Sequence, residues 1–83
     1  METIKSGSTG KDVVLAKENL ERNGYQVDKS DLFDEKMKNV VIDFQRKNGL
    51  DADGIIGYRT WEALLFGGRP VSEKLTEEDF ILM

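Results

Sequence analysis

The chain has 83 residues, of which 39% are hydrophobic and 34% charged, with a formal net charge of −4 and neither cysteine nor histidine. A chain of this length holds one small hydrophobic core, and its apolar content predicts a folded globular domain. Because it lacks thiolates and imidazoles, most nucleophilic catalysis, disulfides and the usual zinc sites are excluded, and we expect no cofactor and no metal.

The charge of the chain also limits its partners. Nucleic acids and anionic membranes attract proteins through Lys and Arg, so neither is an expected partner of a chain with a sequence pI near 4.8. The opening residues Met1 to Lys5 lack the apolar segment of a signal peptide, and no apolar run approaches the length of a transmembrane helix. Any export signal would therefore lie outside this sequence.

Apolar residues at helical spacing predict a first helix from Lys11 to Asn23, which Gly24 ends. Thr9 stands at capping-box spacing from Asp12. Three residues remain candidates for the N-cap of this helix: Ser8, Thr9 and Gly10.

Two further helices follow. The second is predicted from Glu35 to Lys47, with Asp34 as its N-cap and Asn48-Gly49 at its end. The third begins at Gly57, closes at Gly67-Gly68 and carries Trp61, Leu64 and Leu65 on one face. We therefore predict an all-α fold, a small monomeric three-helix bundle. Its expected core comprises Ile4, Val13, Leu20, Phe33, Val41, Phe44, Leu50, Trp61 and Leu64.

A rough internal repeat supports this division. In residues 13–25 and again in residues 41–50, two apolar residues are followed by Asn-Gly and then by an apolar or aromatic residue. The first copy is longer by one helical turn. A Gly-x-x-Gly motif, at residues 7–10 and 54–57, precedes the first and third helices. Two copies are too few for a solenoid, so the repeat predicts one bundle with approximate symmetry.

The composition changes after the third helix, at Gly67-Gly68-Arg69-Pro70. Gly and Pro together are typical of a linker, so we divide the chain into a domain of residues 1–67 and a segment of residues 68–83. This segment ends in the apolar run Phe80-Ile81-Leu82-Met83, which we expect either to begin a following domain or to dock on the bundle.

Several short motifs occur together in a distinctive order. They are Ile4-x-x-Gly7-Ser8-x-Gly10-x-x-Val13, Leu20-x-x-x-Gly24-Tyr25, Phe33, Val40-Val41-x-x-Phe44-Gln45-x-x-x-Gly49-Leu50 and Asp53-Gly54-x-x-Gly57-x-x-Thr60-Trp61-x-x-Leu64. Over residues 4 to 66 this order resembles the peptidoglycan-binding domain of type 1, a three-helix module attached to many bacterial cell-wall hydrolases and phage lysins. The chain departs from the family pattern at Ala16-Lys17, where Leu-Gln is usual, and keeps Gln45 at the equivalent place in the second helix.

The resemblance implies a non-catalytic module that binds peptidoglycan, by its glycan strand or its stem peptide, for a covalently linked hydrolase in the cell wall, periplasm or extracellular space. The stretch Lys74 to Phe80 resembles the opening of a muramidase domain, which suggests one identity for that hydrolase. Because a fold does not fix a function, a protein-interaction or regulatory domain on the same scaffold is the alternative.

Catalysis within the chain would need a pair of carboxyl groups, one of them buried and facing the other across a cleft. The two acidic clusters, Asp51/Asp53 and Glu77/Glu78/Asp79, fall in a turn and at a helix start, where solvation and capping explain them. We therefore expect no catalytic residues.

Four residues are candidates for ligand binding: Gln45, Asp53, Tyr58 and Arg59. Arg59 could hold a stem-peptide carboxylate in a bidentate fork, or be a solvated surface charge. Asp53 could accept amide hydrogens from a muropeptide, or bond to the backbone of its own turn. Trp61 could stack on a sugar, but its helical spacing favours a place in the core.

Overall fold

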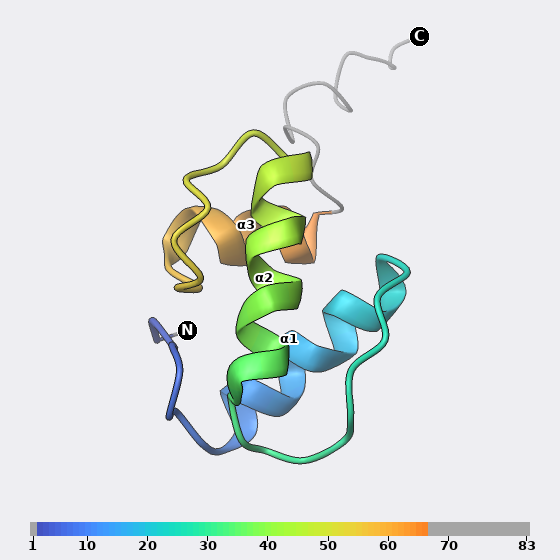
Figure 1. Cartoon of the computed structure of the whole chain (residues 1–83), viewed down its shortest axis with the longest axis vertical. Coiled ribbons are helices and arrows are strands. Elements are labelled where there is room, and N and C mark those ends of the chain that lie inside the picture. The colour runs from blue at the N-terminus through green and yellow to red at the C-terminus, as the bar shows by residue number, and fades with distance from the viewer. Residues whose placement is uncertain (1, 67–83) are drawn as a thin grey trace, which may run out of the picture.

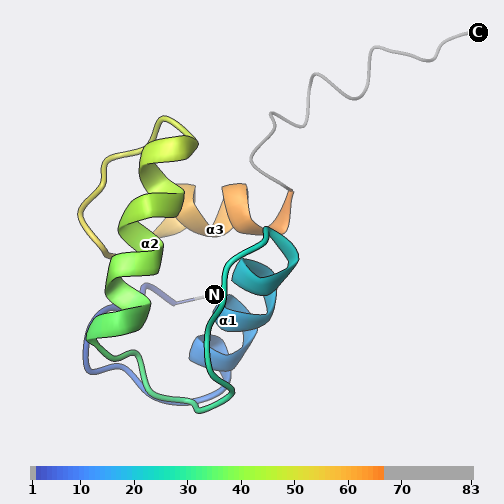
Figure 2. The same cartoon turned by 45° about the vertical axis from the view of Figure 1, so that its right-hand side comes forward.

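The computed structural model describes residues 2–66, which form three helices: α1 (Lys11–Arg22), α2 (Glu35–Lys47) and α3 (Tyr58–Leu65). Helix α1 packs against both α2 and α3, and the long connection between α1 and α2 wraps around one end of the domain (Figure 1, Figure 2). Within these described residues there are only two isolated β-bridges and no strand. The predicted all-α three-helix fold is confirmed, while segment 68–83, with its expected linker, muramidase-like stretch and apolar end, lies outside the described residues.

The helix boundaries follow the predicted capping signals closely. Helix α2 has the predicted bounds, and the Asp34 side chain accepts a hydrogen bond from the Met37 backbone N–H at 2.9 Å. Helix α1 ends one residue earlier than predicted, and its N-cap is Gly10, without a side-chain hydrogen bond. Ser8, another candidate, instead accepts the N–H of Lys5 on its hydroxyl at 3.0 Å.

Helices α1 and α2 end in the same hydrogen-bonded turn. The N–H of Tyr25 donates to the carbonyl of Leu20 at 3.1 Å, and the N–H of Leu50 donates to the carbonyl of Gln45 at 2.8 Å. The intervening Gly24 and Gly49 have φ angles of 92° and 71°, the left-handed conformation that this Schellman turn requires. The internal repeat predicted from the sequence is therefore a structural repeat.

The core contains every residue predicted for it except Leu50, which is partly buried at its edge. It also takes in three apolar residues outside the predicted set: Ala16, Met37 and Ile56. Leu65, expected on the inner face of the third helix, is instead 40% exposed, because that helix turns Thr60, Trp61 and Leu64 inward.

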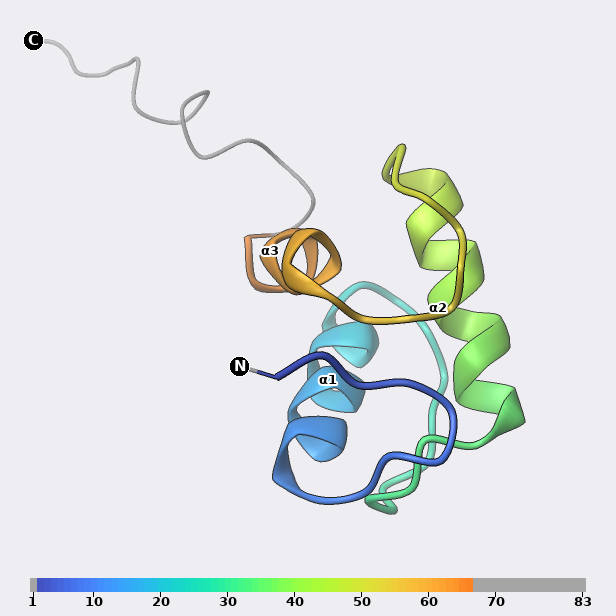
Figure 3. The ribbon, with the colours of Figure 1, turned by 90° about the vertical axis from the view of Figure 1, so that its left-hand side faces the viewer.

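The N-terminal segment fixes the start of α3. Ile4 and Ile56 exchange two backbone hydrogen bonds, of 3.1 and 2.9 Å, so the N-terminal segment runs beside the chain that leads into α3 (Figure 3). The Trp61 indole N–H donates to the carbonyl of Glu2 at 2.9 Å, and its ring is buried. The prediction that Trp61 belongs to the core is confirmed.

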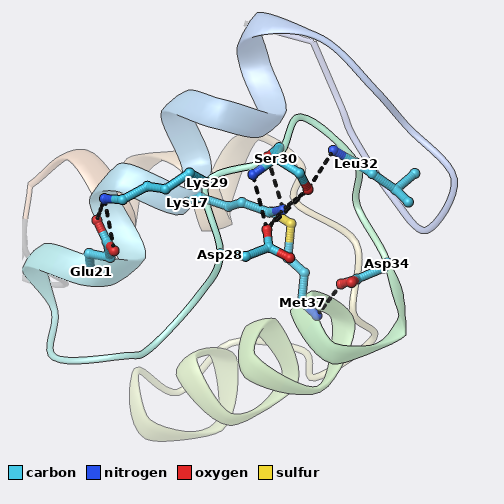
Figure 4. Close-up of polar contacts among 8 residues, drawn as sticks. All are labelled: Lys17, Glu21, Asp28, Lys29, Ser30, Leu32, Asp34 and Met37. Carbon is cyan, nitrogen blue, oxygen red and sulfur yellow. Dashed lines mark hydrogen bonds and ion pairs between the residues drawn. The ribbon is translucent and has the colours of Figure 1, made fainter.

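Within residues 2–66 one charged residue is buried, Lys17 of α1. Its ammonium group bonds to the carboxylate of Asp28 and to the carbonyl and hydroxyl oxygens of Ser30 (Figure 4). An ammonium group has three hydrogens to donate, so these partners satisfy it. The sequence shows only that Lys17 replaces the Gln usual in the family pattern. In the structure, Lys17 anchors the loop that leads to α2.

This contact predicts a specific sensitivity to acid. The hydrogen bond from Lys17 lowers the pKa of the Asp28 carboxyl below its ordinary value of 3.8. Since the folded pKa is the lower one, the contact stabilises the fold fully above about pH 4, and this stabilisation is lost as the pH falls through the lowered pKa. We expect the free energy of unfolding, measured with urea between about pH 7 and 2.5, to fall less steeply below about pH 4 in Asp28→Asn than in the wild type. Parallel curves would contradict this role of Asp28.

Candidate functional site

The side chain of Gln45 is used inside the fold. Only 1% of this residue is exposed, and its Oε1 accepts the N–H of Gly54 at 2.9 Å. Its Nε2 lies within hydrogen-bond distance of three acceptors: Asp53 Oδ1 (3.2 Å), Ile55 O (2.9 Å) and Thr60 Oγ1 (3.0 Å). The prediction that Gln45 meets a ligand directly is therefore revised: this amide ties loop 53–55 to α3 and positions both.

Asp53 shapes the same loop through one of its oxygens. Its Oδ1 also accepts the N–H of Ile55 at 2.9 Å, which is the turn expected as the alternative role of Asp53. The intervening Gly54 has φ of 77°, and a Cβ there would lie 2.9 Å from Cγ of Lys38, so this turn requires glycine. No hydrogen bond within residues 2–66 engages the other oxygen of Asp53, Oδ2.

A pocket of about 360 Å³ opens between this loop and the first turn of α3. It is lined by three of the four predicted site residues, Asp53, Tyr58 and Arg59, and by Asp51. Tyr58 is 78% exposed and forms part of its rim, while Gln45 lies beneath the loop. The structure thus places three of the predicted site residues around one pocket, and it adds Asp51, which the sequence assigns to a turn.

The pocket combines charges of opposite sign that do not pair with each other. The ion pairs within residues 2–66 are Lys17–Asp28, Lys29–Glu21 and Lys47–Asp43, and none of them involves Asp51, Asp53 or Arg59. All three pocket residues are exposed. Their carboxylates and guanidinium can therefore accept from and donate to a bound molecule.

Neither a metal site nor a membrane helix is apparent in the described part of the chain. Residues 2–66 contain no group of three or more acidic side chains arranged to hold a metal ion. No helix in this range is long and apolar enough to cross a membrane.

The first copy of the repeat contains a counterpart of the Gln45 network. Lys17 bonds to Oδ1 of Asp28 and to the carbonyl two residues later, as Gln45 does with Asp53. The N–H of Ser30 donates to Asp28 Oδ1 at 3.2 Å, which repeats the turn at Asp53. Each loop is thus an Asp turn held by one polar side chain from the preceding helix. The aligned pairs Ala16-Lys17 and Phe44-Gln45 were the sequence signal for this equivalence.

The comparison with known proteins agrees with this architecture. A family described as "Putative peptidoglycan binding domain" matches residues 9–64. The chain belongs to this family. The resemblance predicted from the sequence motifs is confirmed.

Regions similar to this chain occur within longer proteins. The carboxy-terminal processing protease CtpA of Bacillus subtilis (strain 168) is 34% identical over 77 residues, which cover 93% of this chain and 16% of the protease. The crystal structure of the Burkholderia AP3 phage endolysin matches with a TM-score of 0.80 and 32% identity, over 86% of this chain and 27% of that one. A peptidoglycan-binding protein from Clostridioides difficile matches with a TM-score of 0.74 and 44% identity, over 76% and 40% of the two chains. The chain therefore spans only a fraction of the length of these relatives.

Proposed function

We propose that this chain is a non-catalytic module that binds peptidoglycan and holds it for an attached cell-wall hydrolase. Membership of the family supports the binding activity and a place in the cell wall or another extracytoplasmic compartment. The match to about a quarter of an endolysin supports a modular role beside a catalytic domain. The observation that carries the proposal is the pocket of mixed charge formed by Asp51, Asp53, Tyr58 and Arg59.

Each side chain of the pocket suits a different part of the wall polymer. The guanidinium of Arg59 can donate two parallel hydrogen bonds to a stem-peptide carboxylate, and the Tyr58 ring can cover an apolar surface of a sugar or alkyl chain. Oδ2 of Asp53 can accept from an amide or ammonium group. Gln45 acts behind them as a positioning residue.

The same pocket is poorly suited to hydrolysis. A glycosidase acid is held in an apolar environment that disfavours its charged form. Both Asp51 and Asp53 are exposed to solvent, and Asp53 is already engaged by Gln45 and Ile55. Binding without bond cleavage is the function that this geometry supports. When the module is linked to an enzyme, modest affinity is sufficient, because tethering raises the local concentration of substrate.

Arg59→Ala is expected to weaken binding to purified sacculi by about 1 to 3 kcal/mol, the range for losing a hydrogen bond to a charged group. The melting temperature should stay nearly unchanged, because Arg59 is exposed. Saturable cosedimentation of the protein with sacculi, over a range of protein concentrations, measures the affinity. Soluble muropeptides released above the buffer rate would contradict the non-catalytic assignment.

The matched control is Arg22→Ala, which removes an exposed arginine from the end of α1, outside the lining of the pocket. This variant should bind sacculi like the wild type. If Tyr58→Ala and Arg59→Ala also bind like the wild type, the ligand contacts another face. If the wild-type protein does not bind at all, the alternative of a protein-interaction domain is favoured.

A further inference from the structure

Helices α2 and α3 begin with nearly the same backbone conformation but with different N-cap residues. The φ and ψ angles are −96° and −175° at Asp34, and −99° and −164° at Gly57. At α2 the Asp34 carboxylate accepts the N–H of Met37, as Figure 4 shows. At α3 the N-cap has no side chain, and no side-chain hydrogen bond caps the helix. The first N–H groups of α3 therefore lack the carboxylate that closes α2.

The two helix starts line related pockets. Asp34, Lys36 and Met37 line a pocket of about 210 Å³, which also includes Asp28 of the first Asp turn. Their structural counterparts Gly57, Arg59 and Thr60 line the pocket of about 360 Å³, together with Asp53 of the second turn. The protein thus contains the same arrangement twice, once with its own carboxylate at the helix start and once without.

The carboxylate of Asp34 indicates what the larger pocket can receive. A helix N-terminus favours an anion, and here Arg59 adds a fixed positive charge within the same pocket. A ligand carboxylate placed between them would occupy at α3 the position that the Asp34 side chain occupies at α2. The role of Arg59 is then to supply the second half of a carboxylate site.

The opposite wall of the pocket has the opposite charge. Asp51 stands two residues before Asp53, whereas the first copy has the neutral Gln26 two residues before Asp28. The larger pocket therefore presents two carboxylates, Asp51 and Asp53, and no ion pair within residues 2–66 neutralises them. They suit a ligand ammonium group.

We infer that this pocket recognises a stem-peptide residue whose side chain ends in an ammonium and a carboxylate on the same carbon, as in diaminopimelate. This inference rests on the proposed function and narrows it. A stem peptide with lysine offers the ammonium alone, and one whose diaminopimelate carboxyl is amidated offers no carboxylate. Each lacks one of the two charges for which the pocket provides a partner.

The decisive variant is Gly57→Asp. A Cβ at Gly57 would meet only Oγ1 of Thr3, at 3.9 Å, and φ there is negative, so an aspartate fits without strain. Its carboxylate should cap α3 as Asp34 caps α2 and should occupy the place of the ligand carboxylate. We expect the melting temperature to be unchanged or higher and the affinity for the diaminopimelate peptide to fall by roughly tenfold or more. Gly57→Asn, whose side chain can cap α3 but carries no charge, should lower the affinity less than Gly57→Asp does.

The ligands for this test are three stem tetrapeptides, N-acetylated and ending in D-alanine amide, with diaminopimelate, amidated diaminopimelate or lysine at the third position. Titrations followed by amide chemical shifts should give the diaminopimelate peptide the highest affinity, by roughly tenfold or more. Asp51→Asn should reduce that preference, and Arg59→Gln should abolish the difference between the free and amidated carboxyl.

Three results would overturn the inference: equal affinity for the three peptides, no binding of the diaminopimelate peptide, or binding by Gly57→Asp equal to that of the wild type. Cosedimentation of the wild-type protein with sacculi is a separate measurement. If it is saturable while any of these three results is found, the proposed function stands and only the ligand assignment fails. If it is absent, the proposed function fails as well.

Discussion

Phe44→Ala is expected to lower the free energy of unfolding by about 3 to 5 kcal/mol, which is most of the stability of a domain this small. Phe44 is buried in α2, and its ring meets that of Tyr25 edge to face, with centroids 6.3 Å apart and an interplanar angle of 76°. The substitution removes this contact and leaves a cavity where α1 and α2 pack. Urea unfolding followed by circular dichroism measures the change.

Phe66→Ala is the matched control, because Phe66 is 51% exposed just after α3. It should change the unfolding free energy by less than about 1 kcal/mol. A melting temperature that Phe44→Ala leaves unmoved would be incompatible with the packing of α2 on the core.

The helices could be predicted because their ends carry local signals. Asp34 accepts a backbone N–H within its own first turn, and Gly24 and Gly49 take a conformation that most other residues avoid. Such signals act over a few residues, so the sequence reveals them directly. The start of α1 has no such local signal, because its N-cap Gly10 makes no side-chain hydrogen bond. The sequence therefore leaves three candidates for that N-cap.

Residues whose environment depends on distant segments were harder to place. Ile56 lies outside the helices and is buried because its backbone pairs with that of Ile4. Lys17 is buried because its partners Asp28 and Ser30 follow eleven and thirteen residues later, in a loop without helical periodicity. Hydrophobic spacing describes the inner face of a helix and carries no information on which loop covers its edge.

In the candidate site, too, the features set by local sequence could be predicted, and those set by distant segments could not. Tyr58 and Arg59 could be predicted as exposed, because they start a helix whose inner face begins with Thr60 and Trp61. Gln45 follows Phe44 at the border of the buried face, and spacing alone cannot tell whether such an amide faces solvent or a loop. In the folded protein the Gln45 amide faces a loop, because its Oε1 accepts a hydrogen bond from the N–H of Gly54.

Gln45→Leu is expected to destabilise the fold and to weaken binding through the shape of the pocket. The substitution leaves the buried Gly54 N–H and the buried Thr60 hydroxyl without the amide that they now contact. Each buried group left unsatisfied costs about 1 to 3 kcal/mol, so a loss of roughly 2 to 6 kcal/mol in unfolding free energy is expected. Since Asp53 is no longer held, affinity for sacculi should also fall, measured at a temperature where the variant is still folded.

Lys17→Met provides the control that separates positioning from stability. It removes the repeat-related contacts to Asp28 and Ser30, so it should also destabilise the fold, but it leaves the α3 pocket intact. At a temperature where both variants are folded, Lys17→Met should bind sacculi like the wild type and Gln45→Leu should bind more weakly. Equal loss of binding in the two variants would assign the effect of Gln45 to global stability, and no loss in either would remove the loop at Asp53 from the binding surface.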